Sequence, residues 1–520
     1  MLFLSLFGAL NPPPLRLGPP QQLLVMTGGV RGGGRARRRG GSDGRGRRGP
    51  AVRPPAKLLT ASLARAESAS EVLRLHAEHG SAFNEIHLAT CWSRLASTSQ
   101  KEGRASSAGD LAPLRQQTVV LADTLGPRAI ASTAHALARL GHFSGAGTSD
   151  GDEWDALWRA LGVAAALRVT EEGGAAFGPQ GLSLTAWAFA KASAGQAPPQ
   201  ALLDAIAVAA IPRLHEFKAQ ELANLAWAYG KSEHAAPALL DKIAAAATPR
   251  LGEFQPQGLA NTAWAFAKAG HPAPSLFEAI TLAAVTRLGS FKPQELANTA
   301  WACATAQYEA PPFYEQLAYA CRVRISDFNA QELANTAWAF AKLGHPAPRL
   351  LSAVAVAATR RAGELKPQEL ASTAWSFAAA NHSAPLLFDA IAQAAVLRVD
   401  QFGPRSIALT AWAFSRASHA SPALFDALAA RATPLLDEFD AQGLANLAWS
   451  FAAAGRPATA LFDGIAAAAG PRLAAGEYKP QELASTAWAF AQVGRNGTDE
   501  LVAALSVEAA CLQLDRIEVL

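Results

Sequence analysis

FKPQELANTAWA, residues Phe291 to Ala302, is the stretch of this 520-residue chain that decides its fold. A near copy, FNAQELANTAWAF, follows at residues 328–340. The tryptophan of the motif recurs first after 40 residues, then at six successive intervals of 37, and finally after 39. A regular interval of this length is typical of a solenoid, in which each repeat buries its apolar face by stacking on its neighbours. The ladder consists of Trp187, Trp227, Trp264, Trp301, Trp338, Trp375, Trp412, Trp449 and Trp488.

Each repeat predicts two helices, which we name A and B. Helix A begins beside a proline such as Pro293, which a first helical turn tolerates, and Glu295 falls where the helix dipole favours a carboxylate. Helix A ends before Gly344 and Pro346, a C-cap and a residue that cannot continue the helix, and helix B begins near Pro348. The sequence therefore predicts an all-α fold, a right-handed α-solenoid of two-helix repeats of about 37 residues.

The rest of the chain divides around this array. Residues 1–56 are predicted to be a disordered targeting segment, 57–144 to hold degenerate repeats, and 145–176 to be an insertion of a loop and a helix. Residues 177–497 hold the nine tryptophan repeats, and 498–520 are predicted to form a C-terminal capping helix.

Two upstream segments continue the repeat in weaker form. Pro127 to Leu137 keeps the pattern with His135 in the tryptophan place, and Asn84 to Leu95, around Trp92, is a more degenerate copy. The array is therefore expected to begin well before the first ladder tryptophan.

Charge is distributed unevenly. Ten of the 46 Lys and Arg residues but only one of the 42 Asp and Glu residues lie within 1–56, so the remaining chain has a net charge of −5 within an overall +4. An Arg-rich, acid-poor start suits an organelle transit peptide; a nucleic-acid-binding arm, or a true start at Met26, are the alternatives. The slightly acidic body argues against binding nucleic acid by a uniform positive charge.

Cysteine usage and hydropathy exclude two classes of protein. Cys91, Cys303, Cys321 and Cys511 have no metal-ligand spacing and are predicted to be buried small apolar residues. No apolar run reaches the roughly 20 residues that a membrane-spanning helix needs, so no membrane insertion is predicted.

Helix A has two chemically different faces. Counting the Phe291 position as one, the Leu at six, Ala at ten and Phe at thirteen fall within about 60° and predict the face against helix B. Ala, Ser or Gly at seven, twelve and fourteen lets neighbouring A helices approach closely. The opposite face carries Gln at four, Asn or Ser at eight, Trp at eleven and often Lys or Arg at fifteen, and we name these four positions the A-helix stripe. Its candidate binding residues are Gln180, Trp187, Lys191, Gln220, Asn224, Trp227, Lys231, Gln257, Asn261, Trp264, Lys268, Gln294, Asn298, Trp301, Gln331, Asn335, Trp338, Lys342, Gln368, Ser372, Trp375, Arg405, Trp412, Arg416, Gln442, Asn446, Trp449, Gln481, Ser485 and Trp488.

The composition of the A-helix stripe permits two interpretations. Rings that stack on bases, amides that meet base edges and cations that meet phosphates are the groups that bind single-stranded nucleic acid. A tryptophan in every repeat also serves packing between repeats, and repeated amides also form a ladder that fixes register. Position eight varies little between repeats, which does not fit a base-by-base code.

The motif at residues 291–302 and its copies resemble the helical repeats of algal and protist organelle RNA-binding proteins. These are the octotricopeptide-type repeats of chloroplast translation and RNA-processing factors and the 37-residue, heptatricopeptide-type repeats of RAP-domain proteins. FAST kinase-like mitochondrial RNA regulators and the repeat domain of the RNA-editing substrate-binding complex look similar. The likeness extends over about residues 84–510.

This resemblance implies an RNA-binding protein of a mitochondrion or chloroplast that acts in RNA processing, stability or translation. Its implied partners are single-stranded RNA of an organellar transcript and other proteins of an RNA-processing complex. Many relatives end in a nuclease-like RAP domain, whereas this chain stops at Leu520 soon after its last repeat, so we expect no RNA cleavage by this chain.

Motifs of catalysis are missing outside the repeats. No phosphate-binding glycine loop, HExxH or serine elbow occurs, so the sequence predicts no catalytic residue, cofactor or metal. The competing hypothesis is a protein-binding scaffold whose concave face receives a peptide. A third is an enzyme that has lost a nuclease module.

Overall fold

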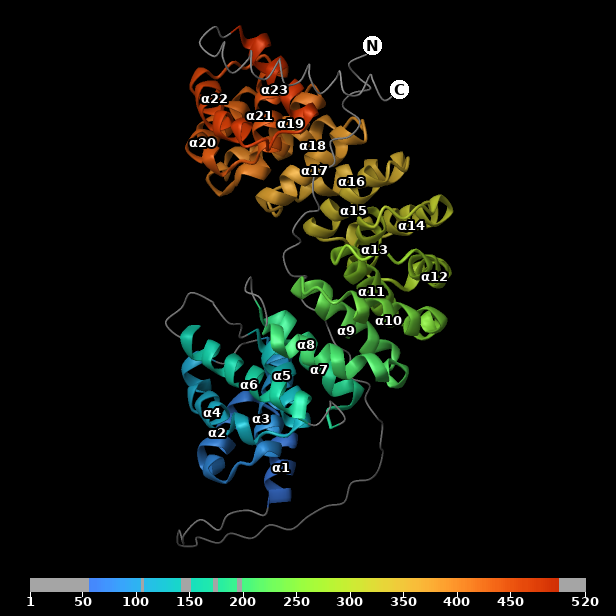
Figure 1. Cartoon of the computed structure of the whole chain (residues 1–520), viewed down its shortest axis with the longest axis vertical. Helices are drawn as coiled ribbons and strands as arrows, with labels where there is room; N and C mark the ends of the chain where they lie inside the picture. The colour runs from blue at the N-terminus through green and yellow to red at the C-terminus, as the bar shows by residue number, and fades with distance from the viewer. Residues whose placement is uncertain (1–55, 104–106, 142–150, 172–175, 194–198, 495–520) are drawn as a thin grey trace. The chain divides into compact units, whose positions relative to one another are not determined.

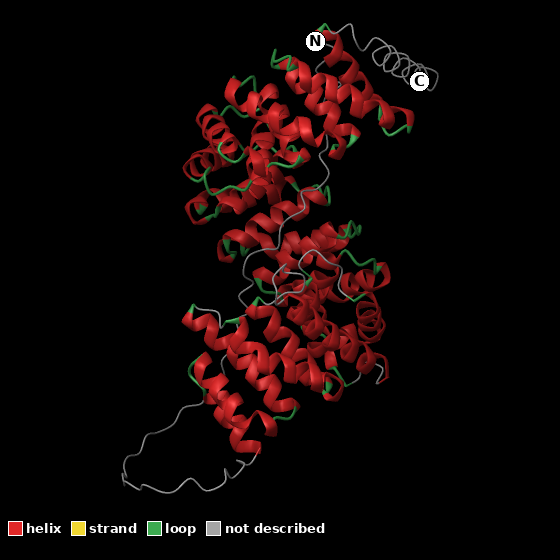
Figure 2. Cartoon of the chain, turned by 90° about the vertical axis from the view of Figure 1, so that its left-hand side faces the viewer, coloured by secondary structure: helices red, strands yellow, loops and turns green. Residues whose placement is uncertain are grey.

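The computed structural model describes residues 56–103, 107–141, 151–171, 176–193 and 199–494. All regular elements of these residues are helices, and none is a β-strand (Figure 2). The described residues divide into an N-terminal unit, up to residue 243, and a C-terminal unit, from residue 244. The predicted capping helix at 498–520 and nearly all of the predicted targeting segment lie outside the described residues.

The N-terminal unit consists of helices that alternate between two layers. α3, α5, α7 and α9 pack side by side as A helices, while α4, α6 and α8 form the B layer. α6 lies within the predicted insertion. The helices of this unit are α1 (Ala56–Arg65), α2 (Ala69–His79), α3 (Glu85–Glu102), α4 (Ala108–Leu121), α5 (Pro127–Leu140), α6 (Gly151–Glu171), α7 (Gly178–Ala192), α8 (Gln200–Ala210) and α9 (Ala219–Ser232), and α10 (Pro237–Ala247) spans the boundary with the C-terminal unit.

The C-terminal unit repeats the same two-layer order with greater regularity. Odd-numbered helices are the A helices and even-numbered helices are the B helices (Figure 1). They are α11 (Pro256–Lys268), α12 (Pro274–Val285), α13 (Pro293–Thr305), α14 (Pro311–Val323), α15 (Ala330–Leu343), α16 (Pro348–Arg360), α17 (Pro367–Ala379), α18 (Pro385–Val396), α19 (Pro404–Arg416), α20 (Pro422–Ala432), α21 (Ala441–Ala453), α22 (Thr459–Ala474) and α23 (Pro480–Val493). The predicted all-α solenoid of two-helix repeats is confirmed within each unit.

The two layers differ in how closely their helices pack. In the C-terminal unit each A helix packs along its length against the next A helix, whereas successive B helices touch more sparsely. Ala297, Ala302 and Ala304 of α13 are fully buried at this contact, since side chains of this size let helix axes approach closely. Tighter spacing in one layer curves an array toward that layer, so the A helices line the inner side of the unit.

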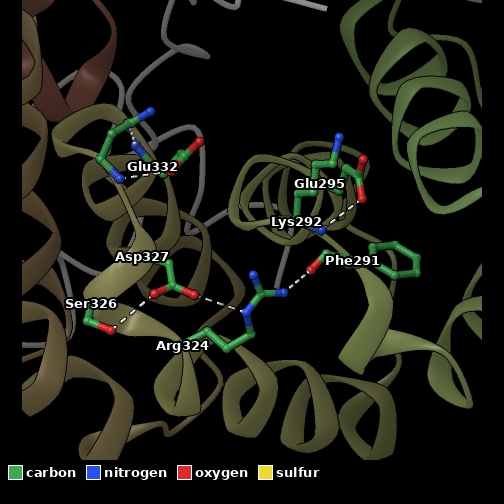
Figure 3. A network of polar contacts seen from close by, with 8 residues as sticks. Phe291, Lys292, Glu295, Arg324, Ser326, Asp327 and Glu332 are labelled. Atoms are coloured by element: carbon green, nitrogen blue, oxygen red, sulfur yellow. Dashed lines mark hydrogen bonds and ion pairs between the residues drawn. The ribbon is translucent and has the colours of Figure 1, made fainter. Parts of the chain in front are cut away.

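Helix starts follow the predicted chemistry. Pro293 is the first residue of α13, and Glu295 accepts a hydrogen bond from the Lys292 backbone N–H at 2.8 Å (Figure 3). In α15 the cap is reciprocal: Glu332 accepts from the Asn329 N–H at 2.8 Å, and Asn329 accepts from the Glu332 N–H at 2.9 Å. Such a capping box satisfies two of the N–H groups that a helix start leaves unpaired.

An arginine at the end of each of several B helices joins its repeat to the preceding one. Arg287, Arg324, Arg361 and Arg398, which we name the arginine clamp, are spaced by 37 residues. Arg324 donates to the carbonyl of Phe291 and lies 3.3 Å from the Asp327 carboxylate (Figure 3). Arg398 donates to the carbonyls of Leu365 at 2.8 Å and Ala362 at 3.2 Å. These hydrogen bonds fix the register of successive repeats, because carbonyls left unpaired at a buried turn are costly.

Candidate nucleic-acid interface

The tryptophans of the A-helix stripe lie between neighbouring A helices rather than on the surface. None of the first seven exposes more than 7% of its area, and Trp301 exposes 0%. Trp449 and Trp488 are half-buried. Of the two interpretations of the stripe, the burial favours packing between repeats, rather than stacking on bases, for Trp187, Trp227, Trp264, Trp301, Trp338, Trp375 and Trp412.

The burial has a physical cause that a single helix does not reveal. Angular positions on an isolated helix place tryptophan opposite the core leucine, but the small residues beside it let the next A helix approach over the ring. Successive rings then contact one another. Centroids are 6.0 Å apart for Trp187 and Trp227 and 6.2 Å for Trp301 and Trp338, with interplanar angles of 36° and 28°. The structural interpretation of the ladder is thus confirmed for these rings.

The tryptophan ladder extends upstream through a histidine. His135 of α5 lies 5.3 Å from the Trp187 ring, so it occupies the tryptophan place as predicted. Desolvation, together with the nearby charges of Arg139 and Lys191, lowers the pKa of His135 to about 4. The ring is therefore neutral at pH 7 and acts as a packing group.

Position eight is buried or half-buried in the stripe repeats that carry Asn or Ser there. Asn261 and Asn335 expose 8% and 6% of their area and Ser372 exposes 2%, so these three are poorly placed to contact a ligand. Asn224, Asn298, Asn446 and Ser485 are half-buried. Close packing of the A helices explains both groups, because position eight lies beside the tryptophan on the same face.

Glutamine at position four remains accessible. Gln180 and Gln220 are exposed, and the six later glutamines of the A-helix stripe are half-buried. The side-chain amides of Gln257, Gln294 and Gln331 form no hydrogen bond with any described residue. Each therefore offers a free donor and a free acceptor at the start of an A helix.

The cations of the A-helix stripe are partly desolvated. Lys191 places its ammonium 4.8 Å from the centroid of the Trp187 ring, and desolvation followed by the charge of Arg139 lowers its pKa. Desolvation also lowers the pKa of Lys342 and of Arg405. Lys231, Lys268 and Arg416 are half-buried. A cation that has already lost part of its hydration gives up less water on binding a phosphate.

Acids are missing from the A-helix stripe, although the A helices carry them at position five, as in Glu295 and Glu332. No Asp or Glu occupies positions four, eight, eleven or fifteen in any of the nine tryptophan repeats. The B helices of the C-terminal unit instead expose an acid at one repeated position, as in Glu278, Glu315 and Asp426. An anionic polymer that lies along the A-helix stripe therefore meets cations and amides but no carboxylate at these four positions.

Sequence patterns did not single out the arginine clamp, although its spacing of 37 residues is the signal that identifies it. Three of the four cysteines, Cys91, Cys303 and Cys321, are buried as predicted, and burial raises the pKa of each to about 12. Cys511 lies outside the described residues.

Neither a metal cluster nor a membrane span is found in the part of the chain that the structure describes. No group of three or more His, Cys, Asp or Glu side chains is arranged there to hold a metal ion. No helix there combines the length and the apolarity needed to cross a membrane.

Comparison with known proteins relates the C-terminal unit to one family. Residues 274–514 match the family model described as RNA-editing substrate-binding complex 6 protein. No curated protein matches the chain.

Two solved structures were compared with the chain. A chain of a full-length AP-3 complex in an intermediate open conformation is 10% identical, with 88% of this chain and 82% of that chain covered and a TM-score of 0.23. A circular tandem repeat protein with a novel repeat topology is 10% identical, with 89% and 97% covered and a TM-score of 0.17. Scores this low carry no argument about fold or function.

Proposed function

We propose that this protein binds single-stranded RNA along the A-helix stripe and acts in organellar RNA processing without chemistry of its own. The observation that carries the proposal is the A-helix stripe itself, where accessible glutamine amides and half-buried cations recur and no acid occupies any of the four positions. The similarity of residues 274–514 to a family named for an RNA-editing substrate-binding complex supports it.

The mode of binding follows from what is accessible. With most tryptophans buried, bases are contacted through hydrogen bonds from position four and phosphates through the cations of position fifteen and Arg405. Nearly uniform glutamines give little discrimination between bases, so we expect weak sequence preference within each repeat. Selectivity then comes from the length of RNA bound and from partner proteins.

Placement in an organelle is a separate part of the proposal. The Arg-rich, acid-poor residues 1–56 have the composition of a transit peptide, and the family match points the same way. Fusion of residues 1–56 to a fluorescent protein is expected to direct it to a mitochondrion or plastid. A diffuse cytosolic signal would contradict this part alone.

Salt-dependent binding of single-stranded RNA tests the proposal. We compare a stripe variant, with Lys268, Lys342, Arg405 and Arg416 all changed to Gln, with a control variant that changes four exposed cations of the B helices, Arg159, Lys242, Arg349 and Arg360, to Gln. Both lose the same charge, but only the stripe variant is expected to weaken binding strongly. Its slope of log affinity against log salt should fall by up to about three, because each phosphate contact to a single strand contributes roughly 0.7.

Each outcome is decisive. Equal losses in both variants would place the RNA elsewhere than on the A-helix stripe. An unmodified chain that binds no single-stranded RNA at low salt would overturn the function itself. Weak, salt-independent capture of peptides would favour the scaffold hypothesis.

A further inference from the structure

Three neighbouring B helices carry large apolar side chains that face solvent. Leu282 of α12, Tyr319 of α14 and Val356 of α16 expose 66%, 60% and 55% of their area and are spaced by 37 residues. We name these three residues the B-helix patch. Because α12, α14 and α16 are successive neighbours in the B layer, the three side chains form one row across it.

Within the C-terminal unit the B-helix patch is confined to these repeats, and Ala245 separates it from Val208 of α8, which is 75% exposed at the same repeat position. The same repeat position holds Ala245 in α10, Gln393 in α18 and Ala430 in α20. In the C-terminal unit, three consecutive repeats therefore carry a large apolar side chain at an outward-facing position where the repeats that follow carry a small or polar one. A contiguous exposed apolar patch of this kind marks an interaction site.

Charges flank the row in an ordered way. Glu278 and Glu315 lie four residues, about one helical turn, before Leu282 and Tyr319. On the other side, Arg360 lies four residues after Val356.

A second arginine, Arg322, lies three residues after Tyr319, with its guanidinium carbon 5.4 Å from that ring. Both glutamates and Arg360 are exposed, and Arg322 is half-buried. The row therefore has acids toward the starts of α12 and α14 and arginines toward the ends of α14 and α16, with Arg349 near the start of α16 as the exception.

This arrangement is complementary to itself. A two-fold axis through Tyr319, perpendicular to the surface, places α14 on α14 of a second copy and α12 on α16. Leu282 then meets Val356, Glu278 meets Arg360, and Glu315 meets Arg322, and each of these pairs forms twice. The remaining charge, Arg349 near the start of α16, lies seven residues before Val356 and falls opposite Gly289, seven residues after Leu282.

We infer that the B-helix patch is a self-association surface that binds the same patch of a second copy of this chain. Other partners lack the feature that singles out a copy, since the patch supplies both halves of every apolar and ionic pair. A patch of three rows forms a small interface, so we expect a dissociation constant on the order of micromolar. This surface lies on the layer opposite the A-helix stripe, so its test does not depend on RNA.

Sedimentation of the full chain without RNA, over about 1–100 µM, measures the association. The 54.2 kDa chain is expected to shift toward twice that mass as its concentration rises. Tyr319→Glu should abolish the shift. Val163→Glu on α6, a site 61% exposed and outside the patch, should leave the shift unchanged. A chain that stays monomeric throughout, or a dimer indifferent to Tyr319→Glu, would overturn the inference.

Exchanging the charges on the two sides of the patch distinguishes a variant that fails to associate from one that fails to fold. A chain with Glu278→Arg and Glu315→Arg, and another with Arg322→Glu and Arg360→Glu, should each fail to self-associate because like charges then meet. Mixed one to one, the two variants should form a heterodimer, since opposite charges meet again at every pair. Failure of the mixture to associate, with both variants folded by circular dichroism, would contradict the two-fold geometry.

Discussion

The inner and outer layers of the C-terminal unit use repetition differently. In the A layer the same residue recurs at the same place, as with Trp301, Trp338 and Trp375, and all three are buried between neighbours. In the B layer the outward position changes from Tyr319 to Gln393 within two repeats. Residues enclosed by two neighbouring repeats must fit both, so they recur, whereas residues that face solvent are free to differ.

This contrast changes how a repeated residue is interpreted. Recurrence made tryptophan a candidate both for RNA contact and for packing between repeats, so recurrence alone could not decide between the two. Glutamine at position four recurs and stays accessible, so it combines regular spacing with an available hydrogen-bonding group. Accessibility, rather than recurrence, separates a binding residue from a packing residue in such an array.

The largest expected effect comes from breaking the inner ladder at its most buried member. Trp301→Ala removes a fully buried indole and should destabilise the protein by about 3–5 kcal/mol. Trp449→Ala, at the same repeat position but half-buried, should cost clearly less. Urea unfolding followed by circular dichroism measures both, and equal losses would mean that burial in the ladder does not govern its stability.

A second effect comes from the histidine that replaces tryptophan in the N-terminal unit. The folded chain holds the pKa of His135 near 4 by burial, against an ordinary value of 6.5. The unfolded chain therefore binds a proton first as the pH falls, and stability is lost between pH 6.5 and about 4, by up to roughly 3 kcal/mol.

The His135→Phe variant isolates this contribution. It should lose less stability than the unmodified chain between pH 7 and pH 5 when urea midpoints are compared. Identical pH dependence in the two proteins would show that His135 is not held neutral.

Breaking one arginine clamp should have the next largest effect. Arg398→Gln removes hydrogen bonds to the carbonyls of Leu365 and Ala362 and should cost about 1.5–3 kcal/mol. The matched control, Arg349→Gln on the exposed start of α16, should change stability by no more than about 0.5 kcal/mol. If the two substitutions cost the same, the clamp does not join the repeats.

The smallest effect is expected in the outer layer. Val356→Thr, at a side chain 55% exposed, should alter the free energy of unfolding by less than about 0.5 kcal/mol. The buried Val354, two residues away on α16, provides the comparison, because Val354→Thr places a hydroxyl among apolar groups and should cost about 1–3 kcal/mol. Comparable losses at the two sites, measured by urea unfolding, would remove the distinction between the layers.

Periodicity predicted the helices and much of the capping, since Pro293, Glu295 and Asn329 act through local chemistry within one turn. Contacts between repeats were harder to predict. Trp301 is buried because the next A helix packs over it, and Arg398 donates to carbonyls of the preceding repeat. Both contacts depend on distances between helices, which the sequence of a single repeat does not specify. Among the candidate residues, Gln294 and Gln331 are therefore half-buried and can still be reached, whereas Asn335 and Trp338 are buried between repeats.

Crosslinking of the full chain to single-stranded RNA by ultraviolet light, followed by mass spectrometry of the crosslinked peptides, tests the central claim most directly. Crosslinks should fall in A-helix peptides, around Gln294, Gln331 and Lys342, and should disappear in competition with excess unlabelled RNA. Crosslinks confined to the B helices, around Tyr319 and Val356, would contradict the assignment of the inner layer as the RNA-binding surface.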